Sequence, residues 1–452
     1  MQDNYDVNDE MTKLLLKHGS NVNVRTNYDT SPLHLATSFR HEKGLTPLDI
    51  AVINKQETFA DLLTSNEADI NARNEEEKTP LIMLISSGEF YDNYLNIVEL
   101  LLKHGARVNS RDIRGKTALH YACRGNCLSD IHVNLVKLLL KYGARVNSKD
   151  NDRKTALHYA CYFKLYGRTV RTKNSAAIEQ KDIMNLLLKH GARVNSRDKH
   201  GITALHYACY FKLSRGRDDE SDIIKLLLKS GARVNSQDND GKTALHFACY
   251  SGCNEAVEEL LEHGSDINIT CKDGRTALDS LDPLKEKTVE LIVYHLVKMK
   301  TANLYISEKN IQSMSIRRYD RITKSIDRRD HCLRELEKMR NEKIANANIS
   351  IYEILVKGTN SLAACMRNEN VVEVSKTARY EMQFPLYACI LKNQFKKGME
   401  RNKLLEPANR CFNSLFNGCP ELPFECAEKI LNYISNEDLK NLINTFEPDC
   451  IS

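Results

Sequence analysis

The sequence predicts an all-α fold in which stacked helix pairs, joined by hairpin fingers, form a solenoid that is followed by a small helical domain. Thr-Ala-Leu-His, then an aromatic residue and Ala-Cys, occurs at Thr117, Thr155, Thr203 and Thr243. A leucine triplet and Gly-Ala-Arg-Val-Asn follow the first three copies. A repeat of this kind is typical of stacked units that share one continuous core. Trp is absent and Gly and Pro number only 19 and 9, which favours helices.

The first helix of each unit begins at the recurring threonine. In the Thr155 unit the threonine can cap the helix, and Leu157, Ala160 and Cys161 then fall on one face at helical spacing. One unit cannot bury both faces of its helices, so we expect the neighbouring units to complete the core.

The second helix of each unit carries the leucine triplet. Leu139 and Leu140 lie on its inner side, and Gly143 is expected to end it in a left-handed conformation. Asn147 and Asp150 follow as turn formers that lead the finger to the next unit. At three finger tips Asp29, Glu77 and Arg153 replace the usual glycine, so we expect either another turn type or a residue with positive φ. The tip glycines elsewhere are Gly115, Gly201, Gly241 and Gly274.

A histidine and a cysteine recur once in every complete unit. Metal binding and catalysis would need such residues to converge at one place, whereas these are spread along the stack. We therefore expect the cysteines to be small buried packing residues and the histidines to be structural. The histidines are His120, His158, His206 and His246, and the cysteines are Cys123, Cys161, Cys209 and Cys249.

These residues resemble the ankyrin repeat, whose Thr-Pro-Leu-His-x-Ala signature opens the first of two antiparallel helices. The resemblance implies about seven to eight repeats, some partial, over residues 1–281. It also implies a stack that binds another protein, with histidines that bridge neighbouring units. Because the tips differ between otherwise near-identical units, we expect them to carry specificity for a target. The tip residues are Arg114, Arg153, Lys199 and Asp240.

The remaining chain divides into a connecting region and a terminal domain. Residues 282–330 hold an amphipathic closing helix (284–300) and a basic linker, and residues 331–452 hold a non-repeating helical domain. Near its end Leu422-Pro423 opens an apolar helix, and Ser435 with Asp438 three residues on predicts the start of a second helix.

This ending resembles the opening of an F-box, and the whole arrangement resembles the poxvirus ankyrin proteins that end in a PRANC domain. The resemblance implies that the terminal helices bind the Skp adaptor of a cullin ubiquitin ligase. Cys426 stands where a larger aliphatic residue is common, and only about ten residues follow Ile443. The alternative is a terminal hairpin that only packs the domain. The Skp-binding residues implied by the resemblance are Leu422, Pro423, Cys426, Ile430, Leu431, Ile434, Leu439 and Leu442.

Composition limits the remaining functions. Lysine and arginine total 65 against 60 acidic residues, a net charge of +5 that is too balanced to predict nucleic-acid or membrane binding. The 14 cysteines include no Cys-x-x-Cys pair, and residues near Met1 are polar, so we expect reduced thiols and no structural zinc. No phosphate-binding glycine loop or nucleophile motif occurs in the sequence.

We therefore expect a monomeric viral adaptor, not an enzyme, with no cofactor. Its ankyrin repeats would capture a host protein, and its terminal helices would present that protein to the ligase. The alternative function is a decoy that sequesters a host signalling protein, in the manner of ankyrin inhibitors of NF-κB, without recruiting a ligase. We expect the protein in the host cytoplasm, with the nucleus as an alternative because of the basic run between Arg317 and Arg329.

Overall fold

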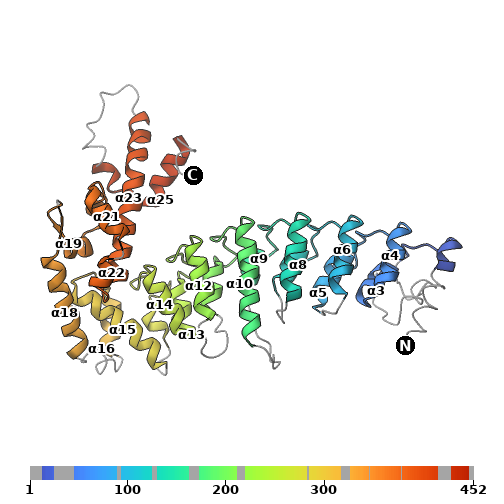
Figure 1. Cartoon of the computed structure of the whole chain (residues 1–452), viewed down its shortest axis with the longest axis horizontal. Coiled ribbons are helices and arrows are strands. Elements are labelled where there is room, and N and C mark those ends of the chain that lie inside the picture. Colours follow the sequence, from blue (N-terminus) through green and yellow to red (C-terminus); the bar gives the residue numbers. More distant parts are fainter. Residues whose placement is uncertain are drawn as a thin grey trace. The chain divides into compact units, whose positions relative to one another are not determined.

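The computed structural model describes residues 13–24, 45–88, 93–124, 130–161, 173–210, 219–281, 285–316, 326–345, 347–377, 379–415 and 429–446. The chain divides into two compact units, residues 1–256 and 257–452, and each is described by itself. Among the described helices, none is long and apolar enough to cross a membrane. The predicted all-α solenoid followed by a helical domain is confirmed (Figure 1).

The first compact unit is a row of helix pairs. Each first helix is short and is followed by a longer second helix that runs antiparallel to it. The pairs are α3 (Pro47–Ile53) and α4 (Glu57–Ser65), α5 (Pro80–Ser87) and α6 (Tyr94–Lys103), α7 (Ala118–Ala122) and α8 (Asp130–Lys141), α9 (Ala156–Cys161) and α10 (Lys173–Lys189), and α11 (Ala204–Tyr210) and α12 (Asp219–Lys229), followed by α13 (Ala244–Ser251).

Each first helix begins at its threonine, as predicted. The Asp49 N–H donates to Thr46 Oγ1 at 3.2 Å, and the Thr46 N–H donates back to Asp49 at 2.8 Å. In later units a histidine replaces this aspartate, and the Thr117 N–H donates to His120 Nδ1 at 3.0 Å. The reciprocal pair satisfies amides that lack partners in a first turn.

The core of this unit lies between the helix layers. Leu157, Ala160 and Cys161 are buried on the first helix, and Leu139 and Leu140 are buried on the second. This agrees with the helical periodicity of the sequence. The four repeated cysteines are buried and free, as a packing role predicts.

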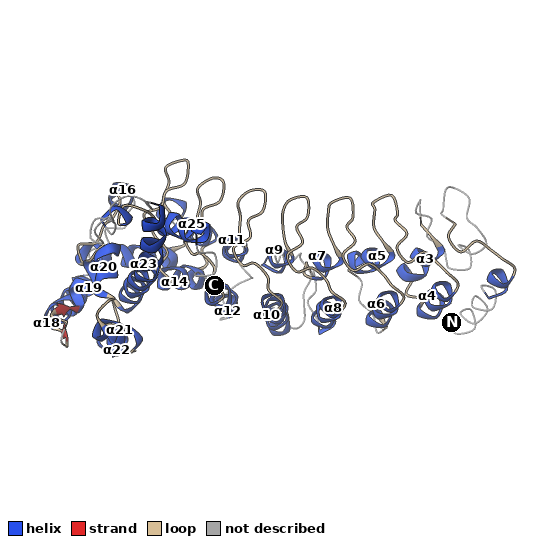
Figure 2. Cartoon of the chain, turned by 90° about the horizontal axis from the view of Figure 1, so that it is seen from above, coloured by secondary structure: helices blue, strands red, loops and turns tan. Residues whose placement is uncertain are grey.

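The fingers of the first compact unit project in a row along one edge. The first helix of each repeat lies nearest to the fingers (Figure 2). Gly143 ends α8 with φ 83°, in the predicted left-handed region. At the finger tips Glu77 and Arg153 adopt φ 55° and 62°, so these residues take the glycine conformation. Asp29 lies outside the described residues.

The predicted closing helix stands where a repeat unit would have its second helix. The last repeat's finger ends at Thr276, and a 3₁₀ turn, η1 (Leu278–Ser280), stands in place of the next first helix. Helix α15 (Glu286–Thr301) follows as its second helix, and Asn303 has φ 57° where earlier units have glycine. Val289, Ile292, Val293 and Leu296 of α15 are buried, as predicted for a closing helix.

The second compact unit also contains the terminal helical domain. Its helices and strands are α16 (Glu308–Ile316), α18 (Ile326–Asn341), β1 (Lys343–Ile344), β2 (Ile349–Ser350), α19 (Ile351–Val356), α20 (Thr359–Cys365), α21 (Glu369–Lys376), α22 (Arg379–Gln383), α23 (Ala388–Leu415) and α25 (Asn436–Phe446). The two short antiparallel strands pair Lys343 with Ser350 and were not predicted from the sequence. Leu336, Leu355, Tyr387 and Phe395 belong to the larger of its two core clusters.

Candidate protein-docking surfaces

Asparagines in several fingers bind the next repeat unit through both Nδ2 and Oδ1. Asn147 Nδ2 donates to the Gly191 carbonyl at 2.8 Å, and its Oδ1 accepts from the Arg193 N–H at 2.8 Å. Asn109 makes the same pair of bonds with Gly143 and Arg145. These bonds satisfy backbone groups at the end of each second helix. The sequence predicted only a turn former here, although the regular Val-Asn spacing carried the signal.

The recurring histidines also bridge neighbouring units, as the resemblance implied. Nδ1 of His158 accepts from the Thr155 N–H, so the proton lies on Nε2, which donates to the Ile202 carbonyl at 3.2 Å. Burial lowers the pKa of His206 to about 4 and also lowers the pKa of His120 and His158. These imidazoles are therefore neutral and structural at neutral pH.

A second hydrogen bond, from a tyrosine to an aspartate, recurs in successive repeat units. The hydroxyls of Tyr121, Tyr159 and Tyr207 donate to Asp112, Asp150 and Asp198 at 2.5, 2.5 and 2.7 Å. Burial and these bonds raise the pKa of Tyr121 and Tyr159. The Thr243 unit has Phe247 at this position, and a phenylalanine has no hydroxyl to make this bond.

The predicted finger tips are exposed. Arg114, Arg153, Lys199 and Asp240 all lie on the surface of the first compact unit. Lys199 Nζ lies 2.6 Å from Asp152 Oδ1 of the preceding finger, and this contact raises the pKa of Lys199 and lowers the pKa of Asp152. Lys199 is thus partly engaged within the stack. Arg114 and Arg153 form no ion pair within the described residues and remain the most available tips.

The terminal hairpin packs on α23 and α20 of the second compact unit. Leu431, Leu439 and Ile443 are fully buried against Ala363, Leu404, Leu405, Ala408 and Cys411. Ser435 starts α25 as predicted, because the Asp438 N–H donates to Ser435 Oγ at 3.1 Å.

Two of the predicted Skp-binding residues lie in the core of the hairpin. Leu431 and Leu439 are 0 % exposed because they fill the core of the hairpin, so they cannot contact a partner in this conformation. Ile430 is 44 % exposed, and Ile434 and Leu442 are partly buried. Leu422, Pro423 and Cys426 lie outside the described residues.

The sequence does not single out two exposed aromatic residues of this hairpin. Tyr433 is 94 % exposed and Phe446 is 43 % exposed. Tyr433 lies one helical turn after Ile430, in the turn that precedes α25. An exposed aromatic residue beside an apolar one is typical of a protein-contact surface.

Comparison with known protein families decides the identity. A family model for ankyrin repeats (3 copies) matches residues 38–112, 90–172, 166–237 and 213–281, more than half of the chain. A model for the PRANC domain matches residues 346–444. The chain is an ankyrin-repeat protein with a C-terminal PRANC domain. This confirms the family that the sequence motifs suggested, the poxvirus ankyrin proteins.

One relative and two solved structures are similar to parts of the chain. An ankyrin-repeat protein of fowlpox virus (strain NVSL) is 25% identical over 207 residues, which cover 41% of this chain and 57% of that protein. The chain thus spans little more than half the length of that relative. The ankyrin domain of Bcl-3, an IκB-family protein, is 25% identical, with a TM-score of 0.42 over 56% of this chain and 100% of that chain. Human ASB11 is 21% identical, with a TM-score of 0.44 over 55% and 97%.

Two exposed tyrosines lie on the ankyrin repeats, and the sequence prediction did not include them. Tyr210 and Tyr250 are 42% and 62% exposed, and their rings stack with centroids 6.2 Å apart. Both lie at the ends of first helices, α11 and α13. The ankyrin stack therefore offers an aromatic surface in addition to its finger tips.

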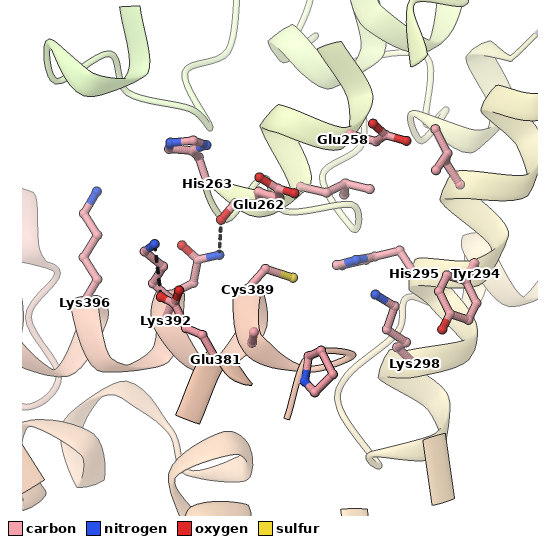
Figure 3. A pocket seen from close by; sticks show the side chains of 15 residues that line it. Glu258, Glu262, His263, Tyr294, His295, Lys298, Glu381, Cys389, Lys392 and Lys396 are labelled. Carbon is pink, nitrogen blue, oxygen red and sulfur yellow. Dashed lines mark hydrogen bonds and ion pairs between the residues drawn. The ribbon is translucent and has the colours of Figure 1, made fainter. Parts of the chain in front are cut away.

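A cavity of about 470 Å³ lies in the second compact unit, between α14 (Asn254–Glu262), α15, α22 and α23. Cys389 and His295 face it from α23 and α15 (Figure 3). Burial raises the pKa of Cys389, and burial together with the Lys298 charge lowers the pKa of His295 to about 4. The thiol is therefore protonated at neutral pH and is not an activated nucleophile.

Several polar groups of this cavity form hydrogen bonds or ion pairs within the protein. Lys392 lies 3.3 Å from Glu381, Lys298 Nζ donates to the Leu386 carbonyl at 3.1 Å, and Asn393 donates to the Glu262 carbonyl at 3.1 Å. Among the described residues, no three His, Cys, Asp or Glu side chains form a cluster suited to a metal ion. The cavity thus lies between α14 and α15 on one side and α22 and α23 on the other.

Proposed function

We propose that this chain is a viral adaptor that binds a host protein through its ankyrin repeats and recruits a Skp–cullin ubiquitin ligase through its PRANC domain. Its chemistry would be carried by the ligase, and the chain itself would supply two binding surfaces. We propose the host cytoplasm as its site of action, because a cullin ligase and most of its targets are reachable there.

The observation that carries this proposal is the exposed apolar surface of the terminal hairpin. Tyr433 and Ile430 are exposed, whereas Leu431 and Leu439 hold the same hairpin to its core. The side chain of Tyr433 is 94 % exposed, so most of its ring is in contact with water. Burying the ring in a groove of a partner would lower the free energy, because apolar surface would be removed from water. The aromatic residue supplies a rigid anchor for such a groove.

The second candidate is a decoy that sequesters a host signalling protein and recruits no ligase. The burial of Leu431, Leu439 and Ile443 favours it, because these residues serve the hairpin's own core. In that case the terminal hairpin would only complete the PRANC domain, and binding would rest on the finger tips with Tyr210 and Tyr250.

Affinity purification from host cells separates the two candidates. The tagged chain is compared with a Tyr433→Ala, Ile430→Asp variant and with Leu333→Asp, a control at another exposed apolar residue (46 %). The adaptor function predicts that the wild type and the control recover Skp and cullin and that the double variant does not. Recovery of a host target without either ligase component would support the decoy.

A further inference from the structure

A buried arginine connects the turn of the terminal hairpin to the rest of the PRANC domain. Arg401 on α23 is only 2 % exposed. Its guanidinium donates from Nε to Asn360 Oδ1 at 3.0 Å, from Nη1 to Asn436 Oδ1 at 2.9 Å and from Nη2 to the Leu431 carbonyl at 2.6 Å. The three acceptors belong to α20, to the first residue of α25 and to the turn before it.

Asn360 extends the same network. Its Nδ2 donates to the Asn432 carbonyl at 2.8 Å, while its Oδ1 accepts from Arg401. Leu431, Asn432 and Asn436 thus receive hydrogen bonds on both sides of Tyr433. The turn is fixed at its two ends, and the exposed tyrosine projects between them.

The charge of Arg401 is costly at this place. All three acceptors are neutral oxygens, and no carboxylate lies within ion-pair distance of Arg401 in the part of the chain that the structure describes. Burial accordingly lowers the pKa of this guanidinium. An apolar side chain of similar length would avoid the desolvation cost. The planar group with five donors is therefore best explained by the geometry it imposes, since it can bind three separate segments at once.

We infer that Arg401 is a positioning residue, which fixes the orientation of the terminal hairpin and thereby presents Ile430 and Tyr433 to the ligase adaptor. This inference rests on the proposed function for the identity of the partner. The fixed geometry of the hairpin is independent of the proposed function. A rigid surface binds more tightly than a mobile one, because less conformational entropy is lost on association.

The test measures the affinity of the purified full-length chain for purified Skp adaptor, together with hydrogen exchange across residues 429–446. Arg401→Lys keeps the charge but cannot reach three acceptors, and Arg401→Met removes the charge. Both should weaken binding at least about tenfold and speed exchange in α25. Arg410→Met, on the exposed part of the same helix, is the control and should match the wild type.

A further variant separates positioning from stability. Arg401→Met combined with Asn360→Leu removes the central polar pair, which should restore the melting temperature toward that of the wild type. Binding should stay weak, because the turn has still lost its attachment. Recovery of binding along with stability would show that Arg401 is only structural, and would overturn the inference.

The two proposals fail in different ways. If the wild type itself binds no Skp adaptor, the ligase function is wrong, and exchange alone then decides the role of Arg401. Unchanged exchange across residues 429–446 in both Arg401 variants would overturn the positioning role, whatever the partner. Faster exchange confined to those residues would support it.

Discussion

Asn268 and Tyr305 are 37 residues apart in sequence, and the Asn268 side-chain amide donates to the Tyr305 carbonyl at 3.1 Å. Oδ1 of Asn268 accepts from the Ser307 N–H at 2.8 Å. Asn268 thus makes the same pair of bonds that Asn147 makes earlier in the chain. The segment after α15 therefore ends like an ankyrin unit, although it lacks the Gly-Ala-Arg-Val-Asn sequence. The second compact unit therefore contains the same repeat architecture within its own first part.

The finger asparagines should be important for local stability. Asn147→Ala removes both bonds to the next unit and leaves backbone groups without partners, at a cost of about 1–3 kcal/mol. Hydrogen exchange at the Arg193 amide, which bonds to Asn147, should accelerate at least about tenfold. Asn96→Ala, on an exposed part of α6, is the control. Equal exchange rates in the two variants would contradict the bridging role.

Replacing Arg153, which has a left-handed backbone conformation at a finger tip, should stabilise the ankyrin repeats. Arg153→Gly relieves a positive φ of 62° and should raise stability by about 0.5–1 kcal/mol. Gly115→Ala should do the opposite, because φ is 72° there and the added Cβ would lie 3.0 Å from the Asn151 backbone nitrogen. Thermal melting of the two variants checks this pair. Melting temperatures that shift in the same direction would refute the account of the tips.

Acid should destabilise the ankyrin stack through its histidines. The pKa of His206 is about 4 in the folded chain, against about 6.5 when unfolded. Between these values the unfolded chain binds more protons, so stability falls as pH drops below about 6.5, by up to about 1.4 kcal/mol per pH unit for each such histidine.

Melting between pH 7.5 and 5 measures this effect before most carboxylates titrate. His206→Asn should melt at a lower temperature at pH 7.5 and should show a shallower dependence on pH. An equal pH dependence in the wild type and the variant would mean that His206 takes up no extra proton on unfolding.

Target capture should depend on the tips that make no contact within the stack. Reversing the charge of Arg114 and Arg153 should weaken binding of the host protein at least about tenfold, while the melting temperature changes little because both side chains are exposed. Lys199→Glu is a less clean test, since it also breaks the contact with Asp152. The assay uses the target recovered with the wild-type chain. A drop in melting temperature with retained binding would assign the tips a structural role.

The sequence predicted the repeated part of the fold well, for a physical reason. Identical residues at Thr155 and Thr203 mark identical local environments, so the caps, the buried leucines and the structural histidines could all be read from their recurrence. The repeat pattern is harder to follow through α15, because the helix before it is reduced to one 3₁₀ turn and Asn303 stands where earlier units have glycine.

The terminal hairpin was harder to predict. Its apolar residues recur at helical spacing, but periodicity cannot say whether an apolar face meets α23 or a partner. The F-box resemblance places Leu431 and Leu439 on the partner surface, but both lie in the core, and it does not single out Tyr433, which is exposed. Arg401 could not be found from sequence, because its acceptors come from segments 30 to 41 residues away.

The central claim is that the exposed side of the terminal hairpin binds a Skp adaptor. Calorimetric titration of purified Skp adaptor into the full-length chain tests it most directly, with Tyr433→Ala and the surface control Leu333→Ala alongside. The account predicts measurable binding by the wild type and the control, and a loss of at least about tenfold in affinity for Tyr433→Ala with an unchanged melting temperature. Binding that is absent from the wild type, or that is equal in all three chains, would contradict it.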